Sequence, residues 1–382
     1  MLTDIADEAV EWRHRIHEYP ELLFDLPRTS AYVAELLRSF ECDEVHTGIA
    51  VSGVVAVVNG NRPGRTIGLR CDMDALPIHE QTNLPYASKV DGRMHACGHD
   101  GHTAILLAAA KALANNRNFS GKVILIFQPA EEGGGGGRVM VEEGMLERFG
   151  IEEVFGMHNQ PNLPIGRFAT RSGPILGSAD MFSIRLTGAA SHAAYPHMGR
   201  DTVVGLASLV TALQTISSRS TDPMDSVAVS VVRLEAGQAE VHNVIPGEGI
   251  LSGTVRTLRQ ITRQNVEARL REIAAGVATM HRLNAEVEWT AGYPVTMNDT
   301  AATRTAIAAA KQIAGAEGTD GEWPAVLGAE DFSYMLEQRP GAFMWLGNGE
   351  GPDVHTPHYN FNDDAIIHGL RYWLALVGQE LA

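Results

Sequence analysis

A change of pattern in the middle of the chain limits the fold most strongly. From residue 1 to about 176, strand-like apolar runs such as "VSGVVAVVNG" and "KVILIFQPA" alternate with helical segments such as "TAILLAAAKALANN". This alternation is typical of an α/β domain whose sheet is covered by helices on both faces. From 177 to 291 the order becomes strand, helix, strand, strand, helix, strand, and from 292 the helix-rich pattern resumes. The sequence therefore predicts a mixed-sheet domain formed by 1–176 and 292–382, interrupted by a smaller α+β domain at 177–291.

The second helix expected in this inserted domain has one apolar stripe. The members of the stripe recur three to five residues apart and are Ile261, Val266, Leu270, Ile273, Val277 and Met280. Such spacing is typical of a helix with one buried face, so we expect all six side chains to face the core of the inserted domain.

Composition excludes several classes of protein. With 45% hydrophobic and 20% charged residues, the 382-residue chain is typical of a folded globular protein. Its formal net charge of −16 argues against binding to nucleic acid or to anionic membranes. The N-terminus lacks the apolar segment of a secretory signal, and no run approaches eighteen apolar residues, so we expect a cytoplasmic protein. Three cysteines, Cys42, Cys71 and Cys97, are too few and too scattered for a disulfide framework.

The segment "MHACGHDGHTA" at 94–104 contains the densest group of residues that could bind a metal. Cys97 and His99 are separated by one residue, at a loop that leads into a helix, and zinc accepts both thiolate and imidazole ligands. The alternative is that His95, His99 and His102 are loop histidines with ordinary hydrogen bonds. The segment alone does not decide between these readings.

A pair of acidic residues follows the next strand, in "FQPAEEGGGGG". Glu131 and Glu132 would repel each other and resist burial unless a cation compensates their charge. The glycines lack the G-x-G-x-x-G spacing and the Lys-Ser/Thr ending of nucleotide-binding loops, which excludes that function. A solvated pair of glutamates in a flexible turn is the remaining alternative.

Two further histidines complete a candidate site. His158 closes an apolar strand in "VFGMHNQPNLPIG", and His355 lies in "VHTPHYNFND" near the C-terminus. Strand ends at one edge of a sheet are where α/β proteins collect functional residues. Either histidine alone could be structural, but together with Cys97, His99 and the glutamate pair they supply enough ligands for two metal ions.

At this point the sequence resembles the co-catalytic metallo-aminoacylase and carboxypeptidase family, in particular its branch of hippurate hydrolases, indole-acetyl-amino-acid hydrolases and related N-acyl-amino-acid amidohydrolases. The resemblance extends over nearly the whole chain and implies a metal-dependent exopeptidase-like catalytic domain with an inserted satellite domain. Its motifs occur in family order and are "RHRIHEYPEL", "LRCDMDALPIHE", "HACGHDGHTA", "FQPAEEGGGGG", "FGMHNQP", "GAASHAAYPHMGRD", "HNVIPGEGILSGTVRTL", "LGAEDFSYMLEQRPGAF" and "HTPHYNFND".

The resemblance also implies roles for individual residues. Glu131 matches the general base, and Asp74 of "DMDALP" matches an acidic residue that orients part of the metal shell. Cys71, where relatives often have a small residue, is read as a buried near-isostere and not as a ligand. The matches to the ligands of two divalent ions (Zn, Mn or Co) are Cys97, expected to bridge, with His99, Glu132, His158 and His355.

The same resemblance implies roles in the satellite domain. His192 of "GAASHAAYP" matches a histidine that stabilises the oxyanion of the reaction, sometimes across a dimer interface. Asn243 and Arg256 are candidates for binding the free carboxylate of the substrate. By resemblance alone, the satellite domain is also expected to form a homo-oligomer.

These roles predict an amidohydrolase for N-acyl or N-aroyl amino acids, in which a metal-activated water attacks the amide and Glu131 is the general base. A dipeptidase or carboxypeptidase of the same family would use the same metal and base residues. Two other readings remain: a thiol amidase in which His99 activates Cys97, and a metal-stabilised binding protein without catalysis.

Overall fold

The computed structural model describes residues 2–382, which divide into two compact units. Unit 1 comprises Met1–Ile175, Met297–Pro324 and Asp331–Ala382, and unit 2 comprises Leu176–Thr296 with Ala325–Glu330. Unit 1 is an α/β unit and unit 2 an inserted α+β unit, which confirms the predicted fold class. Unit 2 begins one residue before the predicted 177–291 insertion, ends five residues after it, and adds a short segment from further along the chain.

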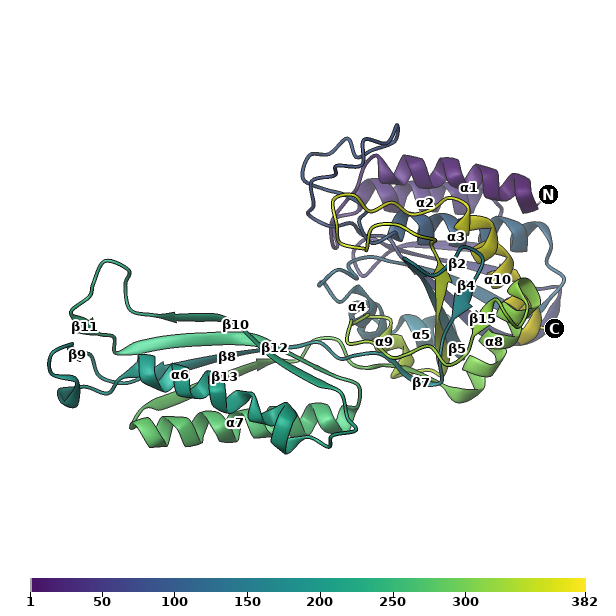
Figure 1. The fold of residues 1–382 in the computed structure, drawn as a ribbon. Coiled ribbons are helices and arrows are strands. Elements are labelled where there is room, and N and C mark those ends of the chain that lie inside the picture. The colour runs from purple at the N-terminus through teal and green to yellow at the C-terminus, as the bar shows by residue number, and fades with distance from the viewer. Residues whose placement is uncertain (1) are drawn as a thin grey trace. The chain divides into compact units, whose positions relative to one another are not determined.

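Unit 1 contains an eight-stranded mixed sheet with the order β1-β2-β4-β3-β5-β16-β6-β15 (Figure 1). Four neighbouring strands in its centre, β4, β3, β5 and β16, run parallel. Their carboxyl ends therefore lie at the same edge of the sheet. The strands are β1 (Glu44–Ile49), β2 (Gly53–Asn59), β3 (Arg62–Asp72), β4 (Ser120–Gln128), β5 (Glu153–Gln160), β6 (Phe168–Ala169), β15 (Thr319–Asp320) and β16 (Gly341–Gly347).

Both faces of this sheet are buried. Along β2, Val54 belongs to the core beneath the helices α1, α3 and α10, and the next residue, Val55, points to the opposite face and is equally inaccessible. On that opposite face the side chain of Met140, from α4, closely approaches Gly53. The helices of unit 1 are α1 (Leu2–His17), α2 (Pro27–Ser39), α3 (His99–Asn115), α4 (Gly136–Glu142), α5 (Met145–Arg148), α8 (Thr300–Ala314), α9 (Ser333–Leu336) and α10 (Ala365–Glu380).

Unit 2 contains a four-stranded antiparallel sheet, in the order β10-β12-β8-β13, and its two long helices, α6 and α7, pack together (Figure 1). Side chains of β8 alternate between the buried core and the other face, as in any half-covered strand. Its elements are β8 (Asp180–Thr187), β9 (Ser191–His192), η1 (Pro196–Met198), α6 (Thr202–Leu213), η2 (Ile216–Ser220), β10 (Val227–Ala236), β11 (Val244–Ile245), β12 (Glu248–Thr257), α7 (Gln260–His281) and β13 (Asn284–Thr290), while β7 (Gly173–Leu176) and β14 (Thr296–Asn298) lie where the chain passes between the units.

The apolar stripe predicted for α7 is correct in its middle and wrong at its ends. Its four central members are buried, but Ile261 is 54% exposed and Met280 is 65% exposed. Five residues separate Ile261 from Val266, which places their side chains about 140° apart around the helix. Thr262, four residues before Val266, is buried in its place. Met280 lies in the last turn of α7, which ends at His281.

No helix within residues 2–382 is both long and apolar enough to cross a membrane.

A buried ionic cluster joins α1 to the first turn of α3. Arg13 Nη1 donates a hydrogen bond to Asp100 Oδ2 at 3.0 Å, and His17 Nδ1 donates to the same oxygen at 2.8 Å. All three side chains are fully buried. Burial opposes the charge of His17, but the carboxylate of Asp100 outweighs this effect and raises the pKa of His17 to about 9.

This cluster predicts a pH dependence of stability. The pKa of His17 rises on folding from its ordinary value of 6.5. Its contribution to the free energy of unfolding is therefore complete below pH 6.5 and is lost as the pH rises through about 9. The shift corresponds to about 3 kcal/mol. We expect the denaturant midpoint of the metal-free protein to fall across this range more steeply than that of His17→Gln. Equal pH slopes for the two proteins would contradict the assignment.

Candidate metal centre

The predicted site residues of unit 1 gather at the carboxyl edge of the parallel strands. Asp74 follows the end of β3, and the pair Glu131 and Glu132 follows the end of β4. His158 lies near the end of β5, the neighbour of β3 on its other side. The topology thus brings together segments that are far apart in the sequence, at the edge where α/β proteins place their functional groups.

Cys97, His99 and His158 form the first group of candidate ligands, with one donor atom from each lying within 4.8 Å of the others. His99 Nδ1 lies 2.8 Å from the carbonyl oxygen of Asp74, and His158 Nδ1 lies 2.7 Å from that of Asn159. A carbonyl oxygen only accepts, so both Nδ1 atoms carry the proton. The Nε2 lone pair of each ring is therefore directed elsewhere, which is the arrangement of most metal-binding histidines.

In both rings Nε2 is therefore the nitrogen that is available to a metal ion. His158 Nε2 lies 3.4 Å from Cys97 Sγ. His99 Nε2 is inaccessible to solvent and makes no hydrogen bond within residues 2–382. A buried imidazole nitrogen without a hydrogen bond is costly unless another partner binds it. The donor set of thiolate and imidazole fits a divalent transition metal at this position.

Cys97 also belongs to a second group, with Glu132 and His355. His355 Nε2 lies 3.2 Å from Glu132 Oε1, and its side chain is about half exposed. His355 lies in the loop between β16 and α10. Its backbone N–H donates to the carbonyl oxygen of Ala96 at 2.7 Å, which fixes His355 next to the segment of Cys97. Because Cys97 is shared by both groups, its sulfur lies within 4.8 Å of candidate donor atoms in each of them.

Asp74 fixes the turn that presents the glutamate pair. Its Oδ1 accepts from the backbone N–H of Glu131 at 3.0 Å, and its Oδ2 accepts from that of Glu132 at 3.1 Å. The preceding residue, Ala130, has a left-handed backbone with φ of 56°. Gly136 follows, and a Cβ there would lie 1.7 Å from the carbonyl oxygen of Pro129, so only glycine fits. Asp74 therefore acts on the glutamates through the backbone and on His99 through its own carbonyl.

The glutamates differ in their surroundings. Glu131 is 8% exposed, and one of its oxygens belongs to a group with His99 and Glu132. Burial opposes ionisation of Glu132, but a hydrogen bond with His355 and the nearby His99 outweigh it and lower its pKa. Glu132 is thus held ionised beside Cys97, as a metal ligand must be.

The charges of the site explain why it requires a cation. Burial, followed by the charges of Glu132 and Glu131, raises the pKa of the Cys97 thiol well above its ordinary value. Burial also opposes the charge of His99, but Asp72 and Asp74 outweigh it and raise its pKa to about 10. A divalent ion reverses both effects, because it stabilises a thiolate and competes with the proton on imidazole.

Sequence reasoning missed two residues of this region. Asp72 is fully buried, and its carboxylate accepts hydrogen bonds from Arg70 at 2.8 Å and from His102 at 2.6 Å. Asn159 is also buried and donates from its side chain to the carbonyl oxygen of Cys97 at 2.6 Å. The i, i+2 spacing of Asp72 and Asp74 on one strand end could have indicated the first. No local signal indicated the second.

In unit 2 the structure brings together two of the three predicted residues. His192 on β9 is exposed and pairs in register with Val244, and the carbonyl oxygen of Asn243 accepts from the backbone N–H of Ala193 at 2.9 Å. The start of β12, at Glu248, adjoins the segment of His192 and Asn243. Arg256 lies near the other end of this strand, eight residues further along the chain. At about 3.3 Å per residue it is roughly 26 Å away along the strand. Arg256 therefore does not share a site with His192 and Asn243 within unit 2.

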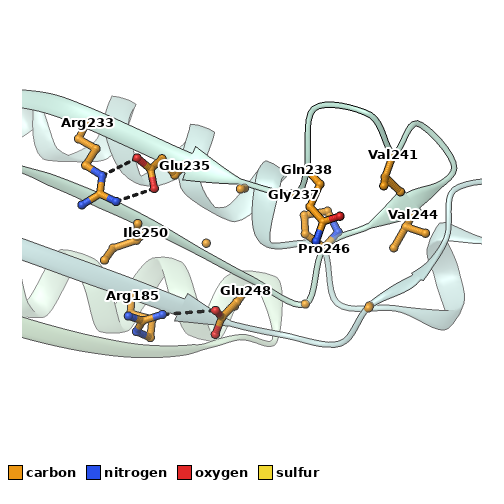
Figure 2. A pocket seen from close by; sticks show the side chains of 14 residues that line it. Arg185, Arg233, Glu235, Gly237, Gln238, Val241, Val244, Pro246, Glu248 and Ile250 are labelled. Atoms are coloured by element: carbon orange, nitrogen blue, oxygen red, sulfur yellow. Dashed lines mark hydrogen bonds and ion pairs between the residues drawn. The ribbon is translucent and has the colours of Figure 1, made fainter.

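Unit 2 also contains a hollow of about 650 Å³. Figure 2 shows that its arginines are paired with glutamates, Arg233 with Glu235 and Arg185 with Glu248. These neutralised charges, all on exposed side chains, do not indicate a particular ligand.

Comparison with known proteins agrees with this arrangement. The model of peptidase family M20/M25/M40 matches residues 68–379. A hippurate hydrolase of Campylobacter jejuni is 38% identical over 375 residues, which cover 98% of this chain and 97% of that protein. Thermostable carboxypeptidase 1 of Saccharolobus solfataricus is 38% identical over 349 residues, or 90% of this chain and 86% of that protein.

The same result comes from a solved structure. A Bacillus subtilis protein described as a dinuclear metal-binding peptidase of family M20 superposes with a TM-score of 0.87 at 33% identity, covering 100% of both chains. Fold, motif order and full-length similarity therefore agree, and the chain belongs to peptidase family M20/M25/M40.

Proposed function

We propose that this protein is a dinuclear metal-dependent amidohydrolase that cleaves N-acyl or N-aroyl amino acids, such as hippurate, into a carboxylic acid and a free amino acid. One observation supports it above all. His99 and His158 both use Nδ1 on backbone carbonyls, His158 Nε2 lies beside the sulfur of Cys97, and the buried Glu131 lies within reach of His99. The similarity to a hippurate hydrolase over the full chain supports the substrate class.

In this proposal each residue has a separate task. Cys97, His99, Glu132, His158 and His355 hold two divalent ions, which when bound polarise the amide carbonyl and make water more acidic. Glu131 accepts the proton of the attacking water and returns it to the departing amine. Asp74 keeps Glu131 and Glu132 in place through their backbone N–H groups.

The proposal also includes unit 2. His192 supplies a hydrogen bond to the oxyanion, and Asn243 or Arg256 binds the substrate carboxylate. The unit also forms the surface of a homo-oligomer. The bound metal is Zn, Mn or Co, and the protein acts in the cytoplasm. These elements stay predictions from the sequence.

A second candidate is a dipeptidase or carboxypeptidase with the same centre. It is favoured by the 38% identity to a thermostable carboxypeptidase, the same value as for the hippurate hydrolase. Metal ligands and base would be unchanged, so only the pocket for the acyl side distinguishes the two.

A panel of substrates tests both candidates. The metal-replete protein is given N-acetyl, N-benzoyl and N-indolylacetyl amino acids and dipeptides, and release of the free amino acid is measured. We expect the acyl amino acids to be hydrolysed with the highest kcat/KM, activity to vanish after exhaustive chelation, and Mn²⁺, Zn²⁺ or Co²⁺ to restore it. Preference for dipeptides would favour the second candidate, and activity that survives chelation would reject both.

A further inference from the structure

We infer that His102 is a positioning residue of the metal centre, which sets the separation of Cys97 and His158 without binding a metal itself. The inference rests on the metal centre of the proposed function. His102 is 2% exposed and lies in the first turn of α3, three residues after His99. With Asp72 and His99 it forms a compact group of donor atoms that resembles a third metal site.

The hydrogen bonds of His102 exclude it as a ligand. The backbone N–H of Asn159 lies 2.9 Å from His102 Nε2 and can only donate, so Nε2 is the acceptor. The proton is then on Nδ1, which donates to Asp72 Oδ1 at 2.6 Å. Both ring nitrogens are thus in use, and no lone pair remains for a metal. His99, in the same turn, makes no hydrogen bond at Nε2 within the described residues, so a metal ion can replace the proton there.

The partner of His102 is the residue that joins the two ligands. Asn159 directly follows His158, and its side-chain N–H donates to the carbonyl oxygen of Cys97 at 2.6 Å. The rings of His102 and His158 also touch, with centroids 4.4 Å apart. Fixing Asn159 therefore fixes both Cys97 and His158, which come from a loop and a strand 61 residues apart.

The other end of this chain of hydrogen bonds is rigid. Asp72 also accepts from Arg70 Nη1 at 2.8 Å, and Arg70 Nη2 donates to Asp331 at 2.9 Å. All three side chains are fully buried. Removing His102 would leave the Asp72 oxygen and the Asn159 N–H without this partner, in a region that water does not reach. We therefore expect Asn159 and the two ligands beside it to shift.

Two substitutions of His102 test its hydrogen bonds to Asp72 and to Asn159 one at a time. In His102→Asn the amide can replace Nδ1 and donate to Asp72, but it is too short to reach Asn159. In His102→Gln the amide oxygen can take the place of Nε2 and accept from Asn159. His79→Gln is the matched control, because His79 is exposed and bonded only to the exposed Asp91 within the described residues.

The readout is cobalt binding by the full-length, metal-free protein. Titration with Co²⁺ gives the number of ions and their Kd values, and the thiolate-to-cobalt absorption band reports the bond to Cys97. Partners of metal ligands typically change metal affinity by about 10- to 100-fold. We expect His102→Asn to bind two ions with at least one Kd about 10-fold weaker and a shifted band. His102→Gln should recover most of the affinity, and His79→Gln should equal the wild type.

Several results would overturn the inference. Unchanged Kd values and an unchanged band in His102→Asn would mean that the residue has a merely structural role. Complete loss of one ion, as expected for His158→Asn, would make His102 a ligand. A His102→Gln variant that binds cobalt no better than His102→Asn would mean that the hydrogen bond to Asn159 does not position the two ligands.

A second variant keeps the test open if His102→Asn does not fold. Tyr359→Phe removes only the O–H that donates to Asn159 Oδ1 at 2.7 Å, and it should shift the same band in the same direction with a smaller loss of affinity. No shift in Tyr359→Phe would then overturn the inference. Failure of the wild type itself to bind cobalt would reject the proposed metal centre before any variant is compared.

Discussion

Replacing Glu131 with Gln is expected to reduce kcat for hippurate by about 10²- to 10⁴-fold, the range of a lost general base, while both metal ions stay bound. The amide has nearly the same volume and can still form hydrogen bonds, but it cannot accept a proton at neutral pH. The turn should persist, because Asp74 holds Glu131 through its backbone N–H and not through its side chain. Turnover and the metal content of the purified protein are measured together.

Glu142→Gln is the control for this experiment. Glu142 lies at the end of α4, shortly after the same glycine-rich turn, and its side chain is 65% exposed. It should leave kcat and metal content unchanged. If Glu131→Gln hydrolysed hippurate at the wild-type rate, the assignment of the base would be wrong. If the metal were lost together with the activity, Glu131 would be a ligand. A wild type that binds both ions but hydrolyses no substrate would instead support the reading of a binding protein without catalysis.

Replacing Cys97 with Ala is expected to weaken the binding of both ions, not of one. Its sulfur belongs to the group with His99 and His158 and also to the group with Glu132 and His355. The loss of a shared ligand should exceed the roughly 10- to 100-fold effect of a residue that only supports a ligand. Competition with a chromophoric chelator measures both affinities, and activity should return only at high concentrations of added metal.

Cys42→Ala is the control for Cys97→Ala. Cys42→Ala should change neither affinity nor activity, because Cys42 belongs to none of the candidate metal-binding groups within residues 2–382 and is partly buried against the hydrophobic core of unit 1. In the thiol amidase reading, Cys97→Ala would abolish activity and leave metal binding unaltered. Burial and the neighbouring glutamates raise the pKa of this thiol, which disfavours a nucleophile in the metal-free site. Loss of only one ion would contradict a bridging role.

Much of the fold could be predicted because its signals are local. The periodic apolar residues of α3, β4 and β12 depend on the sequence alone, and the switch of pattern near 177 indicated the inserted unit. The errors in α7 have a local cause as well. Ile261 satisfies a loose spacing rule but lies on the wrong side of a helix with 3.6 residues per turn.

The candidate ligands could be proposed because each has a chemically distinctive side chain near a strand end or a helix start. No local pattern indicates the order of the strands in the sheet. The folded sheet places His158 Nε2 at 3.4 Å from Cys97 Sγ. In unit 2, Arg256 lies near the end of β12 that is farther from His192. Their separation along the chain gave no sign of this.

The residue types show which side chains are available at the site, and their periodicity shows which segments form its strands and helices. Spacing did not separate His99 from His102, two histidines three residues apart in the same turn of α3, and only the family resemblance named His99 as a ligand. The fold separates them. The carbonyl oxygen of Asp74 accepts a hydrogen bond from His99 Nδ1 and the carboxylate of Asp72 accepts one from His102 Nδ1, but only His102 meets the backbone N–H of Asn159. The role of a histidine depends on which nitrogen keeps its lone pair, and the partners that decide this come from distant parts of the chain.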